Sequence, residues 1–357
     1  MELLSVTMND GVKPRSEIEG KDNSSEDKSN YKIVRKGDMV YNSMRMWQGA
    51  NGISPCDGIV SPAYTVLMPK QEINNGYFAA LFKSTNLINE FRKNSQGMTS
   101  DTWNLKYPQI ETIKVQIPSV SEQDKVSALF SVLDARIVAQ AQLVESLKKY
   151  KRGVVRTLLS PKHCKLKNVE WTTAKIGNIG TFIKGAPLSK ADISSDGTPF
   201  ILYGELYTTY NEVISKVVRK TQASVDKQYY SQIGDVIIPT SGETPEEIST
   251  ASCVMLPDII LAGDLNIYRC TQVDGRIMSY ILNHVVNDRI ARVAQGKSIV
   301  HVQATEISKI EITYPDLISQ KKLIETFDAI TARIDQSMRE LELLQVHRKA
   351  LLQQLFI

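Results

Sequence analysis

The sequence predicts an α+β protein made of two related globular units, each followed by a long α-helix, with the two helices pairing as an antiparallel coiled coil. Three observations predict this fold. Matching residues recur at an offset of 197 positions, apolar residues recur with heptad spacing in two stretches, and short apolar runs typical of strands dominate the rest. A length of 357 residues also suits two domains better than one.

The repeat is clearest where each globular unit ends. Pro118 and Gln123 correspond to Pro315 and Gln320, an offset of 197 positions (315 − 118). Further pairs at this offset are Gly37-Asp38 with Gly234-Asp235, Ile113-Lys114-Val115 with Ile310-Glu311-Ile312, and Arg136 with Arg333. Gln96-Gly97 matches Gln295-Gly296 at an offset of 199, which indicates a slightly longer loop in the second copy.

Heptad spacing predicts two long helices, over 126–158 and 323–355. The first seam is Val126, Phe130, Leu133, Ile137, Gln140, Val144, Leu147, Lys151, Val154 and Leu158. The second seam is Leu323, Phe327, Ile330, Ile334, Ser337, Leu341, Leu344, Arg348, Leu351 and Leu355. Polar residues interrupt both seams at the same two positions, and such residues fix register and partner choice.

A seam of this kind must be buried, and two arrangements bury it. Each helix could pack on its own globular unit, or the two helices could pack on each other. We expect the helices to pair, and in the antiparallel sense rather than the parallel one, because two equivalent units in one chain can then be related by pseudo-two-fold symmetry. That arrangement would place the two units at opposite ends of a rod.

Both globular units are predicted to be rich in strands. In the first unit, a Lys36–Asp38 turn precedes a strand over 39–41, and we expect further strands over 59–68 and 113–117 and a helix over 77–92. The second unit repeats this pattern, with strands over 233–238, 259–268 and 310–313 and a helix over 276–293.

The predicted domains are 1–119, 120–160, 161–316 and 317–357, which alternate globular units with helices. The two units differ at their start. Residue 200 corresponds to residue 3, so residues 171–199 of the second unit have no counterpart in the first. We therefore expect the first unit to lack its opening segment.

Composition argues against several classes of function. The net charge of +4 and the pI of about 8.6 allow an acidic partner such as nucleic acid without requiring one. The four cysteines form no C-x-x-C pair and the four histidines are scattered, so no metal site is predicted. A phosphate-binding glycine loop and a catalytic constellation are both missing, which indicates a binding protein rather than an enzyme. Neither a membrane span nor a signal peptide is apparent, and a cytoplasmic location is expected.

Polar loops at equivalent points of both copies are the candidate binding sites, because Arg, Asn and Gln read base edges. They could equally be ordinary solvated loops. In the first unit the candidate DNA-binding residues are Asn42, Ser43, Arg45, Trp47, Gln48, Lys93, Gln96, Thr99 and Ser100. In the second unit they are Lys184, Thr240, Ser241, Glu243, Gln295, Lys297, Ser298 and His301.

These residues resemble a known family. The runs Leu3–Thr7, Gly37–Gly49 and Val60–Tyr64 look like a target recognition domain of the specificity subunits of Type I restriction-modification systems. Pro118, followed by Glu122-Gln123 and a heptad helix, is similar to the central conserved region of that family. The resemblance covers essentially the whole chain. One departure is Ser319-Gln320, where the family favours Glu-Gln, and another is the missing opening segment of the first domain.

The resemblance implies a non-catalytic DNA specificity subunit. Each globular unit would read half of a bipartite double-stranded DNA site, and the helices would set the spacer and dock two modification subunits. Those partners and the restriction subunits would use S-adenosylmethionine, ATP and Mg²⁺, whereas this chain would bind no cofactor. The expected partner-binding residues of the helices are Phe130, Leu133, Ile137, Val144, Leu147, Phe327, Ile330, Ile334, Leu341 and Leu344.

Two alternatives remain open. A truncated first domain could leave a scaffold or decoy that binds modification subunits without reading a full site. A single-chain restriction enzyme is the weaker alternative, because methyltransferase and nuclease motifs are missing from the sequence.

Overall fold

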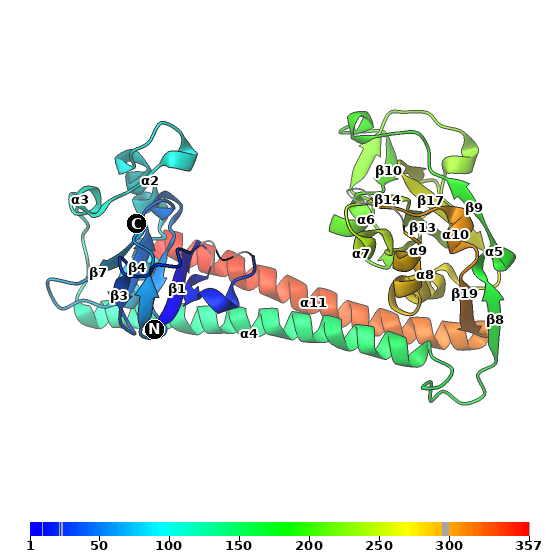
Figure 1. Ribbon diagram of the computed structural model, residues 1–357, viewed down its shortest axis with the longest axis horizontal. Coiled ribbons are helices and arrows are strands. Elements are labelled where there is room, and N and C mark those ends of the chain that lie inside the picture. The colour runs from blue at the N-terminus through cyan, green and yellow to red at the C-terminus, as the bar shows by residue number, and fades with distance from the viewer. Residues whose placement is uncertain (9, 21, 23, 295–299, 357) are drawn as a thin grey trace. The chain divides into compact units, whose positions relative to one another are not determined.

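A computed structural model describes all residues of the chain except 9, 21, 23, 295–299 and 357 (Figure 1). The chain divides into two compact units. Unit 1 comprises Met1–Val144 and Ser337–Ile357, and unit 2 comprises Glu145–Gln336. Each unit therefore contains one globular part together with segments of both long helices, α4 (Val120–Leu158) and α11 (Leu317–Leu355).

Unit 1 contains two small sheets. The first has the order β2 (Gly11–Pro14), β1 (Glu2–Thr7), β6 (Gly58–Val60) and β3 (Lys32–Val34), with β1 and β6 parallel. The second is antiparallel, in the order β5 (Asn51–Ile53), β4 (Met39–Asn42) and β7 (Tyr64–Leu67). The strand predicted over 39–41 is confirmed as β4. The single strand predicted over 59–68 is wrong, because a turn at Ser61–Tyr64 sends β6 and β7 into different sheets.

Except for two short 3₁₀-helices between strands, the helices of unit 1 follow the last strand, β7. They are η1 (Arg15–Glu17), η2 (Met46–Gln48), α1 (Asn75–Leu81), α2 (Thr85–Asn94), η3 (Ser100–Thr102), α3 (Tyr107–Ile110) and the first part of α4. The single helix predicted over 77–92 is two helices. The break occurs at Ser84, whose side chain accepts a hydrogen bond from the backbone N–H of Leu87 and so caps α2. The core of this unit packs Tyr41, Phe91 and Leu105 against Phe130 of α4 and Leu352 of α11.

Unit 2 is built on a five-stranded sheet. Its order is β11 (Val213–Ile214), β15 (Ser252–Val254), β13 (Asp235–Pro239), β17 (Leu265–Cys270) and β9 (Gly180–Lys184). A second sheet has the order β12 (Arg219–Thr221), β10 (Thr198–Leu202) and β16 (Ile260–Ala262). Two strand pairs complete the unit, β14 (Ser241–Gly242) with β18 (Val300–His301) and β19 (Glu311–Pro315) with β8 (Trp171–Lys175).

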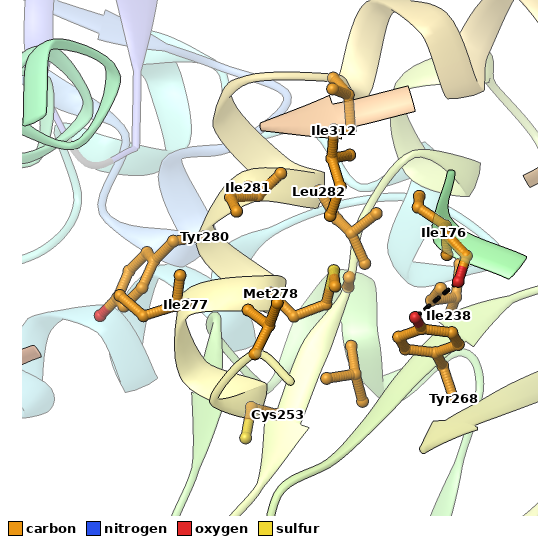
Figure 2. Close-up of a cluster of buried hydrophobic side chains, with 14 of the residues drawn as sticks. Ile176, Ile238, Cys253, Tyr268, Ile277, Met278, Tyr280, Ile281, Leu282 and Ile312 are labelled. Carbon is orange, nitrogen blue, oxygen red and sulfur yellow. Dashed lines mark hydrogen bonds between the residues drawn. The ribbon is translucent and has the colours of Figure 1, made fainter. Parts of the chain in front are cut away.

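The short helices of unit 2 contact both of its larger sheets. They are α5 (Ile176–Ile179), η4 (Lys190–Asp192), α6 (Glu205–Thr208), η5 (Lys227–Tyr229), α7 (Pro245–Ile248), α8 (Gly275–His284), α9 (Asn287–Val293) and α10 (Ala304–Ile307). In the main core, Ile277, Met278 and Ile281 of α8 pack over the sheet (Figure 2). There the Tyr268 hydroxyl donates a 2.8 Å hydrogen bond to the carbonyl of Ile176, which ties β17 to α5 (Figure 2). The single strand predicted over 259–268 and the single helix predicted over 276–293 are again each split in two, as in unit 1.

The two units share a core topology and differ at its edges. The order β5-β4-β7 in unit 1 matches β15-β13-β17 in unit 2, but unit 2 adds β9 beside β17 and β8 beside β19. Both added strands come from residues 171–184. Residues 113–117, all of which the structure describes, form no strand, so that prediction is wrong. The matching β19 is a strand because β8 pairs with it along its length.

The pairing of α4 and α11 is seen within each unit. In unit 1, Gln140 Nε2 donates a 2.9 Å hydrogen bond to the carbonyl of Ser337, and Phe130 stacks on Phe356 with ring centroids 6.0 Å apart. Gln140 pairs with Ser337, whereas Phe130, earlier in α4, pairs with Phe356, which follows α11. The pairing is therefore antiparallel, as predicted. In unit 2, Val155 of α4 lies in one core with Leu323 and Phe327 of α11.

The two long helices begin with different caps. At α4, Ser119 and Glu122 form a reciprocal capping pair, in which the Ser119 hydroxyl donates to Glu122 Oε2 at 2.7 Å. At α11 the cap is Asp316, whose carboxylate accepts hydrogen bonds from the backbone N–H of Ser319 at 3.0 Å and from its hydroxyl at 2.7 Å. The departure Ser319-Gln320 is therefore compensated, because Ser319 completes a cap centred on Asp316.

By length and composition alone, α4 is apolar enough to cross a membrane, although no membrane span was expected. Its apolar side chains follow a heptad seam, however, and Phe130 and Val144 are buried inside unit 1. A long helix with one packed apolar seam passes the same test of length and composition as a membrane span.

Candidate nucleic-acid interface

In unit 1, two loops that are far apart in the sequence meet. The first follows β4 and contains η2, and the second connects α2 to α3. The backbone N–H of Leu105 donates a 2.8 Å hydrogen bond to the carbonyl of Ser43, which joins the two loops. The loops predicted separately as binding sites therefore form one continuous surface.

An aromatic pair lies where these loops meet. Trp47 of η2 and Trp103 of the second loop contact edge to face, with ring centroids 5.2 Å apart. The guanidinium of Arg92 lies 5.9 Å from the centre of the Trp47 ring and also donates to the Trp47 carbonyl. Arg45 is exposed on the same loop. Tryptophan and arginine side chains stack on bases and contact phosphates, so this cluster suits a nucleic-acid surface. We name Trp47, Arg92 and Trp103 the tryptophan cluster.

The structure divides the predicted residues of unit 1 into two groups. Ser43 is buried and donates a 2.6 Å hydrogen bond to the carbonyl of Ala63, while the Asn42 side chain accepts from the backbone of Met44. These two residues hold the first loop in shape rather than face solvent. The residues with accessible side chains are Arg45, Lys93, Gln96, Thr99 and Ser100, with Trp47 and Gln48 half-buried. Lys93 also pairs with Glu90 at 2.7 Å.

Unit 2 joins its loops in the same way. The backbone N–H of Val302 donates a 3.0 Å hydrogen bond to the carbonyl of Thr240. This bond corresponds to the one between Leu105 and Ser43, because Val302 and Thr240 lie 197 positions after Leu105 and Ser43, respectively. Pairing of β14 with β18 extends the junction. The repeat predicted from the sequence therefore extends to the hydrogen bond that closes each loop surface.

Beside this junction lies a cavity of about 520 Å³. Three of the predicted residues, Lys184, Thr240 and His301, line it together, although they come from three separate parts of the chain. Ser241 is buried and donates to Asp264 Oδ2 at 3.1 Å, and Glu243 is exposed at the loop tip. The remaining predicted residues of this unit, Gln295, Lys297 and Ser298, lie outside the described residues.

Sequence reasoning missed several residues of both surfaces. Trp103 and Arg92 complete the tryptophan cluster, and Phe182, Asp264 and Asn266 line the cavity of unit 2. Trp103 lies three residues beyond Ser100, the last predicted residue of this loop, so an aromatic residue there was a usable signal. Asn266 and Phe182 sit on strands, where only the pairing of β9 with β17 brings them to the cavity.

A half-buried tyrosine supports the junction of unit 2. The Tyr207 hydroxyl donates a 2.5 Å hydrogen bond to the carbonyl of Ser241. Burial raises the pKa of Tyr207 well above its ordinary value, with a further contribution from the charge of Glu247. The phenol therefore stays protonated and remains a donor across the physiological range.

The predicted partner-binding residues of the helices lie mostly within the helix pair. Phe130, Val144, Phe327 and Ile334 are buried, and the other six predicted partner-binding residues are half-buried. The buried seam residues also pack on the globular parts: Phe130 lies in the core of unit 1, and the Phe327 ring contacts Tyr280 with centroids 4.8 Å apart in unit 2. The polar interruptions have partners too: Arg348 pairs with Asp134 of α4 in unit 1, and Lys151 pairs with Glu212 at 2.9 Å in unit 2.

Unit 1 presents a separate apolar groove on the outside of its helices. This groove has a volume of about 470 Å³, and its walls include Leu133 and Leu344 from the predicted set. Leu129 and Val132 beside them are exposed, with 45% and 70% of their surface accessible. Exposed apolar surface of this kind on a helix typically marks a contact with another protein.

Within the described ranges, no group of three or more His, Cys, Asp or Glu side chains could hold a metal ion. The surfaces described above offer hydrogen-bonding groups, aromatic rings and cations, which are the groups that bind nucleic acid.

Comparison with known proteins gives consistent matches over most of the chain. Residues 5–149 and 168–345 match the model of a family described as the Type I restriction modification DNA specificity domain. The chain is 21% identical over 347 residues to the Type I restriction enzyme MjaVIII specificity subunit of Methanocaldococcus jannaschii, covering 90% of this chain and 78% of that protein. It is 22% identical over 294 residues to a putative type I restriction enzyme MjaX specificity subunit of the same organism, covering 77% and 65%.

Two solved structures share the fold. One is a chain from a study of complex assembly and conformational transition of the type I R-M system, with a TM-score of 0.62, 15% identity, and coverage of 92% of this chain and 83% of that chain. The other is the Type-I restriction-modification system S subunit from M. genitalium, with a TM-score of 0.56, 16% identity, and coverage of 91% and 84%.

Proposed function

Because this chain belongs to the family of Type I restriction-modification DNA specificity domains, we propose that its two globular parts each read one half of a bipartite DNA site. The chain is a DNA specificity subunit of a Type I restriction-modification system and is not itself an enzyme. The half-site readers are the globular parts at 1–119 and 161–316. The complex acts in the cytoplasm, where it meets cellular DNA.

One observation carries this proposal: the same backbone hydrogen bond closes a loop surface in both units. The hydrogen bonds between Leu105 and Ser43 and between Val302 and Thr240 support an origin of both loop surfaces by duplication, followed by divergence of their side chains. The side chains beside the junction differ, with the tryptophan cluster in unit 1 and a polar cavity in unit 2. The same backbone arrangement with different side chains suits the recognition of two different half-site sequences.

The helices set the spacer between the half-sites. A heptad seam can slip in register unless polar residues oppose this. Gln140 bonded to the Ser337 carbonyl and Arg348 paired with Asp134 support a single register within unit 1. A fixed register gives a fixed length of paired helix. Two DNA-binding domains joined by a rigid connection of fixed length recognise half-sites at a fixed spacing.

Two modification subunits dock on the helices and supply adenine methylation with S-adenosylmethionine. Restriction subunits add the ATP- and Mg²⁺-dependent reaction. The apolar groove with Leu129 and Val132 is the docking surface that unit 1 contributes. The mild net charge of +4 fits a subunit whose partners share the phosphate contacts.

The test is reconstitution with the cognate modification subunits, followed by long-read sequencing that detects methylated adenine. We expect a single bipartite motif with a constant spacer. The chain alone should bind DNA weakly and lose that binding as salt rises, because phosphate contacts release counterions. Methylation without any bipartite motif, in a complex that assembles and binds S-adenosylmethionine, would contradict the proposal.

A second candidate function is a scaffold that docks modification subunits and reads one half-site or none. The observation that favours it is the edge of unit 1, where residues 113–117 lie outside any sheet while the equivalent β19 is paired with β8. The same sequencing experiment separates the two. A scaffold predicts no methylated motif, or a motif confined to one half-site, although the modification subunits still bind.

A further inference from the structure

One polar side chain in unit 2 is buried without a hydrogen-bond partner. Asn266 is the second residue of β17, opposite Ile238 of β13 and Lys184 of β9. Only 3% of its surface is exposed, and its Nδ2 amide finds no partner among the residues that the structure describes. Buried amides are nearly always hydrogen-bonded, because removing them from water without compensation costs free energy.

The fold itself does not require an amide at this position. In unit 1 the register partner of Tyr41 on β7 is Thr65, and Tyr41 corresponds to Ile238 at the offset of 197. Thr65 therefore occupies the place of Asn266 in an otherwise similar sheet. A leucine or threonine would complete the sheet of unit 2 without leaving an amide unsatisfied, so the amide has a different use.

Asn266 lines the cavity of about 520 Å³ beside the loop junction. Its neighbours there are chemically varied: the Phe182 ring, the Asp264 carboxylate, and the exposed side chains of Lys184 and His301. The Phe182 ring is itself held by Tyr268, with centroids 4.7 Å apart. The site thus combines a buried donor, a fixed aromatic ring, an acceptor and cations.

This combination matches a nucleobase with its phosphate. The volume lies in the range of small-molecule sites. Asparagine pairs with the hydrogen-bonding edge of a base, and a carboxylate accepts from an exocyclic amino group. A phenylalanine ring stacks on bases, and a lysine at the rim contacts phosphate. A purely apolar ligand would leave Asn266 unpaired and would desolvate Asp264 and Lys184.

We propose that this cavity binds one base of the half-site read by unit 2, with Asn266 donating to an acceptor on the edge of that base. The inference rests on the proposed function, because it names the reading group within one of the two half-site readers. Asn266 is the specificity-determining residue, and Phe182 and Lys184 hold the ring and the phosphate.

The first experiment needs no partner subunit. The full chain is labelled with ¹⁵N-asparagine, and the side-chain amide of Asn266 is assigned by its loss in the variant Asn266→Leu. The four deoxynucleoside monophosphates are then titrated separately at millimolar concentrations. We expect at least one to shift the Asn266 amide resonances, and to do so less in Phe182→Ala. If none of the four nucleotides shifts these resonances, the proposal is overturned, whether or not the chain directs methylation.

The second experiment uses the reconstituted complex and the DNA duplex that it methylates. Each position of the half-site is replaced in turn by an abasic nucleotide, and binding is compared between the wild type and Asn266→Leu. We expect one abasic position to weaken wild-type binding by about tenfold or more and to have little effect in the variant. Uniform weakening at every position, or no weakening by Asn266→Leu, would overturn the proposal.

Two controls separate this outcome from misfolding. Asn266→Leu should melt no lower than the wild type, since it removes an unsatisfied buried amide. Lys220→Ala, an exposed lysine on β12 in the other sheet of unit 2, should bind every abasic duplex as the wild type does. A wild-type complex with no sequence preference would instead count against the proposed function, and the nucleotide titration would still decide the cavity.

Discussion

The side chain of Gln320 donates a 2.8 Å hydrogen bond from Nε2 to the carbonyl of Pro315 and, through Oε1, accepts one of 2.7 Å from the backbone N–H of Asp274. Gln123 makes the equivalent bonds in unit 1, to Pro118 at 3.0 Å and from Asn74 at 2.9 Å. Both glutamines are buried. Each one ties the start of a long helix to the end of a strand or loop and to the cap of a helix in the globular part.

Replacing Gln320 should therefore destabilise unit 2. Gln320→Leu leaves the Pro315 carbonyl and the Asp274 N–H buried without partners, and we expect a loss of about 2–4 kcal/mol in the free energy of unfolding. Urea denaturation followed by circular dichroism measures it. Gln345→Ala, an exposed glutamine on the same helix, is the matched control and should change the free energy by less than about 0.5 kcal/mol. Equal effects of the two substitutions would contradict this role.

A buried charge cluster attaches α4 to the globular part of unit 2. Glu212 accepts from Lys151 Nζ at 2.9 Å and lies 2.7 Å from His284 Nε2. Burial acts to raise the pKa of Glu212, but the hydrogen bond with His284 and the charge of Lys151 outweigh it and hold the pKa at about 2. Because this pKa lies below the ordinary 4.5, the cluster stabilises the fold above about pH 4.5, and that stability is lost as pH falls towards 2.

Comparing the wild type with Glu212→Gln between pH 7 and pH 3 tests this cluster. The stability difference should be largest at neutral pH and shrink below pH 4.5. At pH 7, Lys151→Met should cost about 3–5 kcal/mol, because Glu212 is left with one partner fewer. The double variant Lys151→Met/Glu212→Gln should lose less than the sum of the single losses. Additive losses at every pH would show that the pair is not coupled.

The cap of α11 gives a second, separable pH effect. Hydrogen bonds from Ser319 lower the pKa of Asp316 to about 2, with further bonds from the backbone of Glu170 and Ile318. The carboxylate therefore stabilises the first turn above about pH 3.8, and this contribution is lost as pH falls towards 2. Asp316→Ala should speed amide hydrogen exchange in the first turn of α11 at neutral pH. Asp316→Asn should keep slow exchange, because asparagine also caps helices, and should remove the pH dependence.

The tryptophan cluster should matter for DNA rather than for folding. Trp103→Ala removes one ring of the pair with Trp47, and we expect DNA binding by the reconstituted complex to weaken by about 5- to 50-fold. Met98 is fully exposed in the same loop, and Met98→Ala is the control. Abasic substitutions in the half-site read by unit 1 should lose their effect in Trp103→Ala, whereas those in the other half-site should keep it. An unchanged affinity would remove this cluster from the interface.

The apolar groove of unit 1 should bind a modification subunit. Val132→Asp places a charge in the exposed wall of the groove and should weaken association by at least about tenfold. Val138, also on α4, is 55% exposed but lies outside the groove, so Val138→Asp is a matched control for charge and helix propensity. Analytical ultracentrifugation of the mixed subunits measures both. If the two variants associate equally well, the groove is not the docking surface.

The sequence predicted the long helices and the repeat correctly because both can be identified from the spacing of residues along the chain. Apolar residues every three or four positions specify a helix with one buried stripe, and the seam from Val126 to Leu158 contains enough turns to outweigh any single exception. The polar interruptions at Gln140 and Ser337 were also visible, although their mutual hydrogen bond was not. The antiparallel sense followed from symmetry between two copies rather than from any residue.

Residue spacing alone could not decide which elements pair across the chain. Residues 113–117 and 311–315 have the same strand-like pattern, yet only the second is a strand, because β8 supplies its hydrogen-bonding partner. The break at Ser84 depends on a cap, and the loops that contain Trp47 and Gln96 are joined by the hydrogen bond between Leu105 and Ser43. Asn266 is the strongest case. Its sequence neighbours indicate an ordinary strand. Its amide lines a cavity only because β9 and β18 pack around it, and these strands are distant from Asn266 in the sequence.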